Sequence, residues 1–188
     1  ELLAWPDPHD WLLRVSVADI GASGPFSIFP GVDRWFAVLS GDGVRLETAG
    51  APPVELTSAQ DALHAFRGDL ATHCTALGNT TRDFNLMAQR DGVQLRQRPL
   101  GTGAQFATSA VGAGLFVTRS TEVGDEDGLG TPLPAMALAW WPNPRREQLR
   151  LRAASARVRG WWFEVETSSY STRCRNTAMA ASSSMHTE

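Results

Sequence analysis

The sequence predicts an all-β protein that is built as a β-sandwich or β-barrel and holds little helix. Turn-forming residues punctuate the whole chain, with 17 Gly and 11 Pro among 188 residues. Short runs rich in Val, Leu, Phe and Trp lie between these turns at intervals of about ten residues. Many short strands joined by tight turns are typical of sandwiches and barrels.

The predicted strands carry the period of a half-buried strand, in which apolar and polar side chains alternate. In Leu12–Ala18, for example, Leu13, Val15 and Val17 share one face, while Arg14 and Ser16 lie on the other. The other predicted strands are Trp35–Leu39, Val44–Thr48, His73–Leu77, Gly92–Arg98, Gln105–Thr108, Leu115–Arg119, Met136–Trp140, Gln148–Ala153 and Trp161–Thr167.

Three connecting segments carry signals of their own. Ser40-Gly41-Asp42-Gly43 predicts a β-hairpin between its two flanking strands, because Gly tolerates positive φ. Gly124–Pro134 predicts a long acidic loop. The segment after Tyr170 is rich in Ser, Thr and Ala without any period, and we expect a poorly packed extension there.

Helical signals are weak. Thr57–Phe66 is the best candidate, with Thr57 or Ser58 as N-cap, and an extended strand is the alternative. Arg145–Arg159 contains good helix formers, but Leu and Arg alternate within Gln148–Ala153 and favour a strand.

Composition excludes several classes of function. The net charge of −3 does not favour a nucleic-acid-binding surface. The longest apolar run, Ala135–Trp141, is far shorter than the ~18 residues that span a bilayer, and no N-terminal signal segment is visible, so a cytoplasmic protein is expected. All 17 basic residues are Arg, which excludes Schiff-base lysines and a P-loop lysine.

Metal and disulfide chemistry are not expected either. Cys74 and Cys174 are the two cysteines, and neither lies in a C-x-x-C motif, so two reduced thiols are the better prediction. The four histidines are scattered without H-x-H or H-E-x-x-H spacing, which argues against a metal site. We expect no cofactor.

The stretch from Gly21 to Gly41 has the spacing of a metal-binding motif without its ligands. Gly21 is followed by five residues and then by Ser27-x-Phe29; four further residues lead to Arg34, and six more to Gly41. It resembles the first motif of cupin barrels, which is Gly, five residues, His-x-His, three or four residues, Glu, six residues, Gly. Ser27 and Phe29 stand at the two His positions, and Arg34 stands at the Glu position.

Four further segments occur in a characteristic order along the first half of the chain. They are Trp11-x-x-Arg14-x-Ser16, Gly24-Pro25-Phe26-Ser27-x-Phe29-Pro30-Gly31-x-Asp33-Arg34, Phe66-x-Gly68-Asp69 and Asp83-Phe84-Asn85-x-Met87. This set resembles the HutD/Ves family of cupin-like proteins. The resemblance covers Trp11–Arg90, and beyond that it depends on the strand pattern alone.

The resemblance implies a bicupin, that is, two β-barrel-like sandwiches in one chain. The implied units are residues 11–90 as the first barrel, 91–168 as the second, and 169–188 as a C-terminal extension. The segment from Phe66 to Asp69 stands where a second cupin motif begins. Ala71 lies at the offset of the expected ligand His, and His73 follows two residues later.

If the motif geometry holds, Ser27, Phe29 and Arg34 point into the first barrel. A site suited to a cation then becomes one with a permanent positive charge. A buried guanidinium must be paired, because an unpaired charge costs several kcal/mol. The sequence leaves two partners open: an internal carboxylate (Asp33, Asp69 or Asp83) that plugs the barrel with a salt bridge, or an anionic ligand held by a two-pronged contact.

Thr81–Met87 offers a second set of candidate residues. Thr, Asp and Asn readily close turns through side-chain-to-backbone bonds, which predicts a turn that closes the first barrel, with Phe84 and Met87 in the core. Asp83 and Asn85 are the candidates at the pocket rim, since an amide can both donate to and accept from a polar ligand. The full set of candidate ligand-binding residues is Ser27, Phe29, Arg34, Asn85, Asp83 and Arg14.

Three functions follow. The first is a non-catalytic protein that binds a small anionic molecule; the resemblance implies a sensor or regulator in histidine utilisation, with N-formylglutamate or a related acyl amino acid as ligand. The second is a metal-independent isomerase or epimerase with His73 or Asp83 as general base. The third is a protein-binding scaffold. We expect no nucleic-acid or membrane partner, and strand-edge pairing would suit a homodimer.

Overall fold

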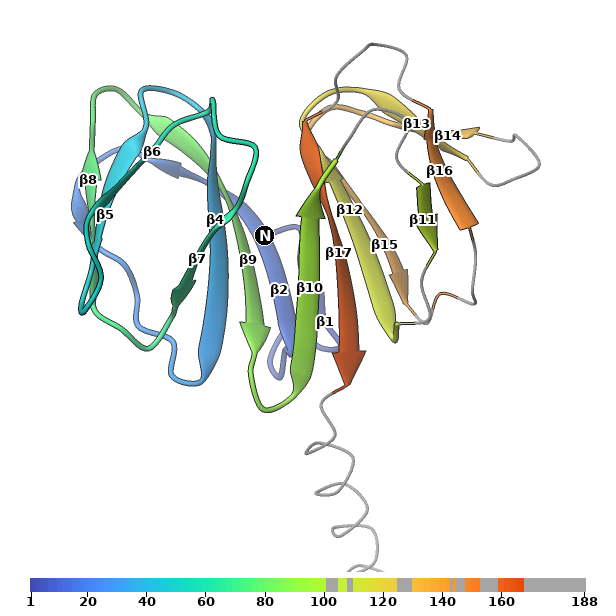
Figure 1. Ribbon diagram of the computed structural model, residues 1–188, viewed down its shortest axis with the longest axis horizontal. Helices are drawn as coiled ribbons and strands as arrows, with labels where there is room; N and C mark the ends of the chain where they lie inside the picture. Colours follow the sequence, from blue (N-terminus) through green and yellow to red (C-terminus); the bar gives the residue numbers. More distant parts are fainter. Residues whose placement is uncertain are drawn as a thin grey trace, which may run out of the picture.

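The computed structural model describes residues 1–100, 105–107, 110–124, 130–142, 144, 148–152 and 159–167 (Figure 1). Every regular element within these residues is a β-strand, which confirms the predicted all-β class. The strands are β1 Leu3–Trp5, β2 Leu13–Ile20, β3 Gly24–Pro25, β4 Val32–Ser40, β5 Val44–Thr48, β6 Val54–Leu56, β7 His64–Arg67, β8 Thr72–Ala76, β9 Thr81–Gln89, β10 Val93–Pro99, β11 Gln105–Ala107, β12 Gly112–Val117, β13 Thr121–Gly124, β14 Gly130–Leu133, β15 Ala137–Pro142, β16 Gln148–Arg152 and β17 Gly160–Thr167.

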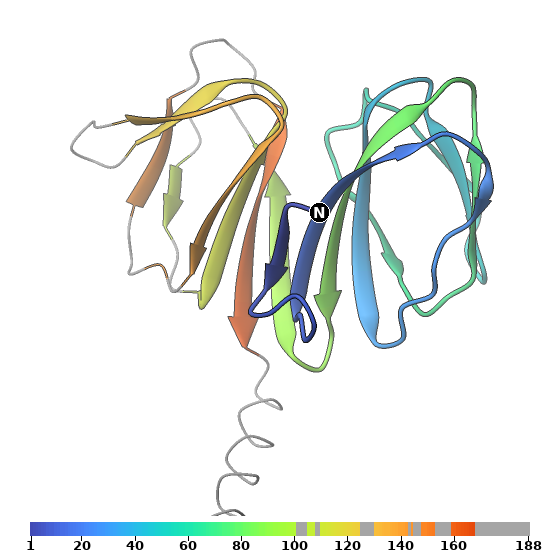
Figure 2. The same cartoon turned by 180° about the vertical axis from the view of Figure 1, so that it is seen from behind.

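The strands form four antiparallel sheets in two halves, which lie side by side in Figures 1 and 2. In the first half, an inner sheet of order β1-β2-β9-β4-β7 faces an outer sheet of order β3-β8-β5-β6. In the second half, an inner sheet of order β10-β17-β12-β15 faces an outer sheet of order β11-β16-β13-β14. The chain passes from one half to the other at the tight connection between β9 and β10.

The two inner sheets share one apolar core. Phe84 of β9 stacks on Trp161 of β17 with ring centroids 5.1 Å apart, and Phe116 of β12 lies 4.5 Å from the same Phe84 ring. Trp5 of β1 reaches across to Trp140 of β15 at 5.7 Å. Because the buried rings of Phe84, Phe116 and Trp161 lie between the halves, burial of this interface contributes to the stability of both.

Each half also has an interior between its own two sheets. In the first half this interior holds the apolar side chains of Phe36, Val38, Val44, Leu46, Leu56 and Cys74. In the second half it holds Ala113, Leu115, Val117, Val123 and Trp162. Both faces of β4, β9, β12 and β17 are therefore buried, which is the reason for their nearly continuous runs of buried residues.

The predicted strands are found where the sequence placed them, with shifted ends. Val44–Thr48 coincides with β5, and Trp35–Leu39 lies within β4. β12 begins at Gly112 rather than at Leu115, and β4 begins at Val32 rather than at Trp35. A Cβ on Gly114 would lie 2.1 Å from Cζ of Phe163, so the absence of a side chain at Gly114 makes room for the aromatic ring of Phe163.

The predicted hairpin at Ser40-Gly41-Asp42-Gly43 is wrong. Among the described strands, β4 pairs with β7 and β9, whereas β5 pairs with β6 and β8. Gly41 and Gly43 have φ of 96° and 101°, and a Cβ on either would lie 2.5 Å from a backbone oxygen. The tight turn exists, but it carries the chain from the inner to the outer sheet, because each strand buries its apolar face in a different layer.

The helix considered for Thr57–Phe66 is also wrong. Thr57 Oγ1 accepts a hydrogen bond from Ala59 N at 3.3 Å, which closes a local turn and does not cap a helix. The turn does not continue into a helix, and β7 begins at His64. The alternative of an extended strand is correct for the last part of this segment.

The segment Thr81–Met87, predicted as a turn, is the central strand β9 of the first inner sheet. Its polar residues misled the prediction, because they face the interior of the first half while Phe84 and Leu86 face the second half. Phe84 and Met87 are buried, as expected.

Other predictions fall partly outside the described residues. The segment predicted as an acidic loop begins at the end of β13 and includes β14, and these two strands pair antiparallel. Its middle, residues 125–129, lies outside the described residues. Gln148–Arg152 is a strand, as favoured over a helix. The segment after Tyr170, which includes Cys174, lies outside the described residues. Cys74 is a buried free thiol.

Candidate functional site

The interior of the first half contains a buried guanidinium. Arg34 lies on β4 and is only 4% exposed. The register pairs it with Phe66 of β7 and with Met87 of β9, and side chains two residues apart along these strands share its face. The predicted inward orientation of Arg34 is therefore confirmed by the strand register.

Aromatic rings surround this guanidinium. Its Cζ lies 4.9 Å from the ring centroid of Phe26, 4.9 Å from that of Phe66 and 5.8 Å from that of Phe29. Ring faces attract a cation through their quadrupole, and the attraction is stronger where water is excluded. The charge is thus in contact with π-systems on several sides.

Within the described part of the chain, Arg34 has no carboxylate partner within 4.0 Å, and its Nε donates to no acceptor. The predicted partners Asp33 and Asp69 both pair with Arg90 instead, at 2.7 and 2.6 Å. Asp33 alternates with Arg34 along β4 and therefore lies on the other face. The internal salt bridge that would plug the barrel is not formed by these two residues.

Asp83 and Asn85 share the interior with Arg34. They are 3% and 8% exposed and lie on β9 on the same face as Met87. Oδ1 of each accepts no hydrogen bond from any described residue. They are thus buried inside the half rather than at a pocket rim, because β9 is the central strand of the inner sheet.

Burial and mutual attraction set the protonation of this pair. The pKa of Arg34 is lowered to about 10, because desolvation and the charge of Arg14 lower it by more than the charge of Asp83 raises it. Desolvation raises the pKa of Asp83 to about 7, which the charge of Arg34 opposes and that of Asp19 reinforces. Near neutral pH, Arg34 is therefore charged, and Asp83 is poised between its two forms.

The raised pKa of Asp83 predicts a specific dependence of stability on pH. The native state binds the proton of Asp83 more tightly than the unfolded chain does. The resulting contribution to the unfolding free energy is complete below about pH 4 and is lost as the pH rises to about 7. Asp83→Asn removes the titrating group. The unfolding free energy of this variant minus that of wild type is therefore expected to increase by about 2–3 kcal/mol between pH 5 and pH 8. Urea denaturation at both pH values measures this difference, and parallel pH profiles for the two proteins would contradict it.

Gly68 positions the loop that covers Arg34. Phe29 N donates to Gly68 O, and Gly68 N donates to Val32 O, each at 2.7 Å. A Cβ on Gly68 would lie 3.3 Å from Cδ of Arg34, so a larger residue would press on the arginine. The neighbouring Asp69 accepts hydrogen bonds from Arg67 and Arg90, which hold its pKa well below its usual range. The segment Phe66–Asp69 thus supports the site.

The remaining candidate residues have different positions. Ser27 is exposed, so its predicted inward orientation is wrong: residues 26–31 are not a strand, and the alternation of a strand does not apply. Phe29 is half-buried and contacts Arg34, as predicted. Arg14 is partly exposed, pairs with Glu1 at 2.6 Å, and lies on β2 opposite Met87.

Three residues of the site were not predicted from the sequence: Phe26, Phe66 and His64. His64 is half-buried, lies opposite Phe36 on the inward face, and stacks on Phe66 with ring centroids 5.8 Å apart. Desolvation lowers its pKa. The alternation of His64 and Phe66 was visible in the sequence, but the expected helix in that segment concealed it.

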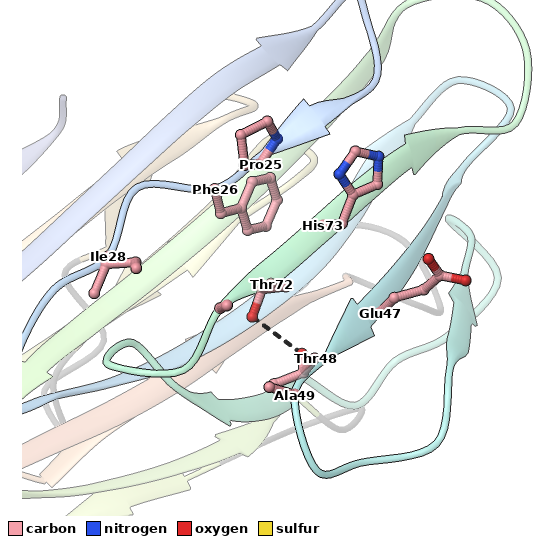
Figure 3. A pocket seen from close by; sticks show the side chains of 9 residues that line it. Pro25, Phe26, Ile28, Glu47, Thr48, Ala49, Thr72 and His73 are labelled. Atoms are coloured by element: carbon pink, nitrogen blue, oxygen red, sulfur yellow. Dashed lines mark hydrogen bonds between the residues drawn. The ribbon is translucent and has the colours of Figure 1, made fainter.

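A pocket of about 470 Å³ adjoins this interior, between the segment after β3 and the ends of β5 and β8 (Figure 3). Figure 3 shows Phe26 and Ile28 on one side, and Thr48 and Thr72 joined by a hydrogen bond of 3.1 Å on the other. Phe26 lines this pocket and also covers Arg34, so its ring borders both. His73 lines the pocket as an exposed residue.

The described residues offer few donors for a metal. No group of three or more His, Cys, Asp or Glu side chains in the described part of the chain is arranged to hold a metal ion. Within the same residues, no helix is long and apolar enough to cross a membrane. The candidate site consists of the side chains of Arg34, Asp83, Asn85 and His64 and of the aromatic rings around the guanidinium.

The fold is that of the all-β, cupin-like jelly-roll class. A cupin barrel protein from Leptotrichia buccalis shares the fold, with a TM-score of 0.52 at 7% identity over 83% of this chain and 84% of that one. The chain belongs to the HutD family, whose model matches residues 1–158. HutD from Pseudomonas fluorescens SBW25 superposes with a TM-score of 0.73 at 26% identity, over 84% of this chain and 80% of that one.

Two curated relatives agree with this assignment. An uncharacterised 21.2 kDa protein in the hutC 3′ region of Pseudomonas putida is 38% identical over 61% of this chain; that match spans 58% of the relative. Protein Ves of Cronobacter sakazakii is 30% identical over 84% of this chain and 83% of its own length. The family resemblance inferred from the sequence motifs is confirmed.

Proposed function

We propose that this protein binds a small carboxylate ligand inside its first half, without catalysis, and acts as a regulatory protein in histidine utilisation. The observation that carries the proposal is the buried guanidinium of Arg34, whose Nε donates to no acceptor and which has no carboxylate partner within 4.0 Å among the described residues. A guanidinium presents a planar fork of donors that matches a carboxylate.

The class of ligand follows from the neighbours of Arg34. Oδ1 of Asn85 and Oδ1 of Asp83 accept no hydrogen bond from any described residue. The rings of Phe26 and Phe66 around Arg34 provide apolar contact. An acyl amino acid presents a carboxylate, an amide and an aliphatic stem, and N-formylglutamate is our candidate. The link to histidine utilisation is supported by the family and by the location of the Pseudomonas putida relative in the hutC 3′ region.

Isothermal titration calorimetry tests the proposal directly. The protein is titrated with N-formylglutamate, urocanate and histidine at pH 6.5, where Arg34 remains charged. We expect saturable heat with N-formylglutamate and weaker or no heat with histidine, whose ammonium group would approach the guanidinium. An absence of heat with all three compounds would contradict the proposal.

A second function, metal-independent acid–base catalysis, is favoured by one observation. Burial raises the pKa of Asp83 to about 7, which is the range suited to a general base. The other candidate base, His73, is exposed on β8. Incubation of the same three compounds with the protein in D2O, followed by NMR, distinguishes the two functions. Deuterium incorporation that Asp83→Asn abolishes would establish catalysis, and its absence would leave binding as the function.

A further inference from the structure

Asp83 and a ligand carboxylate would compete for one cation. Both side chains are buried in the same interior, where desolvation raises the pKa of Asp83 and the charge of Arg34 opposes that rise. The two groups attract each other without direct contact, because no nitrogen of Arg34 lies within 4.0 Å of a carboxylate oxygen of any described residue. A ligand carboxylate on Arg34 would remove that support and add a further negative charge beside Asp83.

A buried carboxylate that loses its counter-charge becomes neutral. Neutral Asp83 is an O–H donor, and its Oδ1 accepts no hydrogen bond from the described residues. A carboxylic acid kept neutral by its surroundings can hold an anionic oxygen by donating to it. The same side chain that repels an anion in its ionised form would therefore bind one in its protonated form.

We propose that Asp83 is the specificity-determining residue of the Arg34 site and binds the ligand in its protonated form, so that ligand binding takes up one proton. In this arrangement Arg34 pairs with one carboxylate, and the Asp83 O–H donates to a second oxygen of the ligand. The proton comes from solvent, and no covalent bond changes. This inference rests on the proposed function, because it concerns the same site and the same ligand.

The other charged groups near Asp83 do not supply this proton. Arg34 on β4 stays charged near pH 7, and burial raises the pKa of Cys74 on β8 to about 11. Asp19 on β2 forms an ion pair with Arg82 at 2.7 Å, which lowers its pKa. His64 on β7 also faces the site; burial lowers its pKa, and it needs its own control.

The test measures N-formylglutamate binding by calorimetry from pH 5.5 to pH 8.5, in two buffers of different ionisation enthalpy. The carboxyl groups of this probe stay ionised throughout that range. With a pKa of about 7 for Asp83, the affinity is expected to be about 30-fold weaker at pH 8.5 than at pH 6, and the buffer comparison is expected to show uptake of about one proton at pH 8.

Two variants separate the possible sources of this dependence. Asp83→Asn keeps a hydrogen-bond donor of the same shape and is expected to bind with an affinity that changes less than about 3-fold across the range. His64→Gln is expected to keep the wild-type slope. A slope that survives in Asp83→Asn, or affinity that is flat or rises with pH in the wild type, would overturn the inference while leaving the proposed function intact. No binding at any pH would overturn both.

Discussion

Arg34→Met is expected to weaken the binding of N-formylglutamate by at least about 100-fold while leaving the protein as stable as wild type or more stable. Met fills a similar volume without a charge, so the variant loses the cation that pairs with a carboxylate. It also removes a guanidinium whose desolvation is not offset by any carboxylate within 4.0 Å among the described residues.

The expected change in unfolding free energy for Arg34→Met lies between no change and a gain of about 3 kcal/mol. Loss of the contacts with the three phenylalanine rings costs about 1–2 kcal/mol, and relief from burying the charge offsets this. Calorimetry measures the affinity and urea denaturation measures the stability. Wild-type affinity in this variant would contradict the role assigned to Arg34.

Arg90→Met is the matched control, because it makes the same substitution at a different site. Arg90 is partly exposed and joins Asp33 to Asp69, outside the interior that holds Arg34. We expect a loss of about 1 kcal/mol in unfolding free energy and an affinity within a few-fold of wild type. An equal loss of affinity in both variants would show that the effect is not specific to the buried guanidinium.

Trp161→Ala is expected to lower the unfolding free energy by about 3–5 kcal/mol. Trp161 is fully buried between the two halves, where its ring stacks on Phe84 at 5.1 Å and on Phe116 at 6.1 Å. Its Nε1 also donates to the backbone oxygen of Asp61 at 2.7 Å. The substitution leaves a large cavity and an acceptor without its donor. Urea denaturation monitored by the remaining tryptophans measures the loss.

Trp161→Phe separates packing from hydrogen bonding. Phe keeps an aromatic ring against Phe84 but cannot donate to Asp61, so a smaller loss of about 1–2 kcal/mol is expected. Because the core is shared by both inner sheets, both variants are expected to unfold in a single transition that involves both halves. A loss below about 1 kcal/mol for Trp161→Ala would contradict the assignment of this residue to the shared core.

The strands were predictable because alternation and turn residues are local properties. Pairing was not: the signal at Gly41 and Gly43 correctly indicated a tight turn, yet the flanking strands belong to different sheets. The central strand β9 was missed, because both of its faces are buried and polar Asp83 and Asn85 point inward. Buried polar residues in a central strand break the usual apolar pattern of such strands.

The amino-acid sequence by itself determined the all-β class, the positions of most strands, the family, and the inward orientation of Arg34. Only the tertiary structure decided that Asp83, and not Asp33 or Asp69, is the carboxylate that shares the interior with Arg34, and that Phe26 rather than Ser27 covers it. The physical reason is that alternation places residues on one face of a single strand, whereas the burial of a side chain and its proximity to an opposite charge depend on how separate strands and sheets pack against each other.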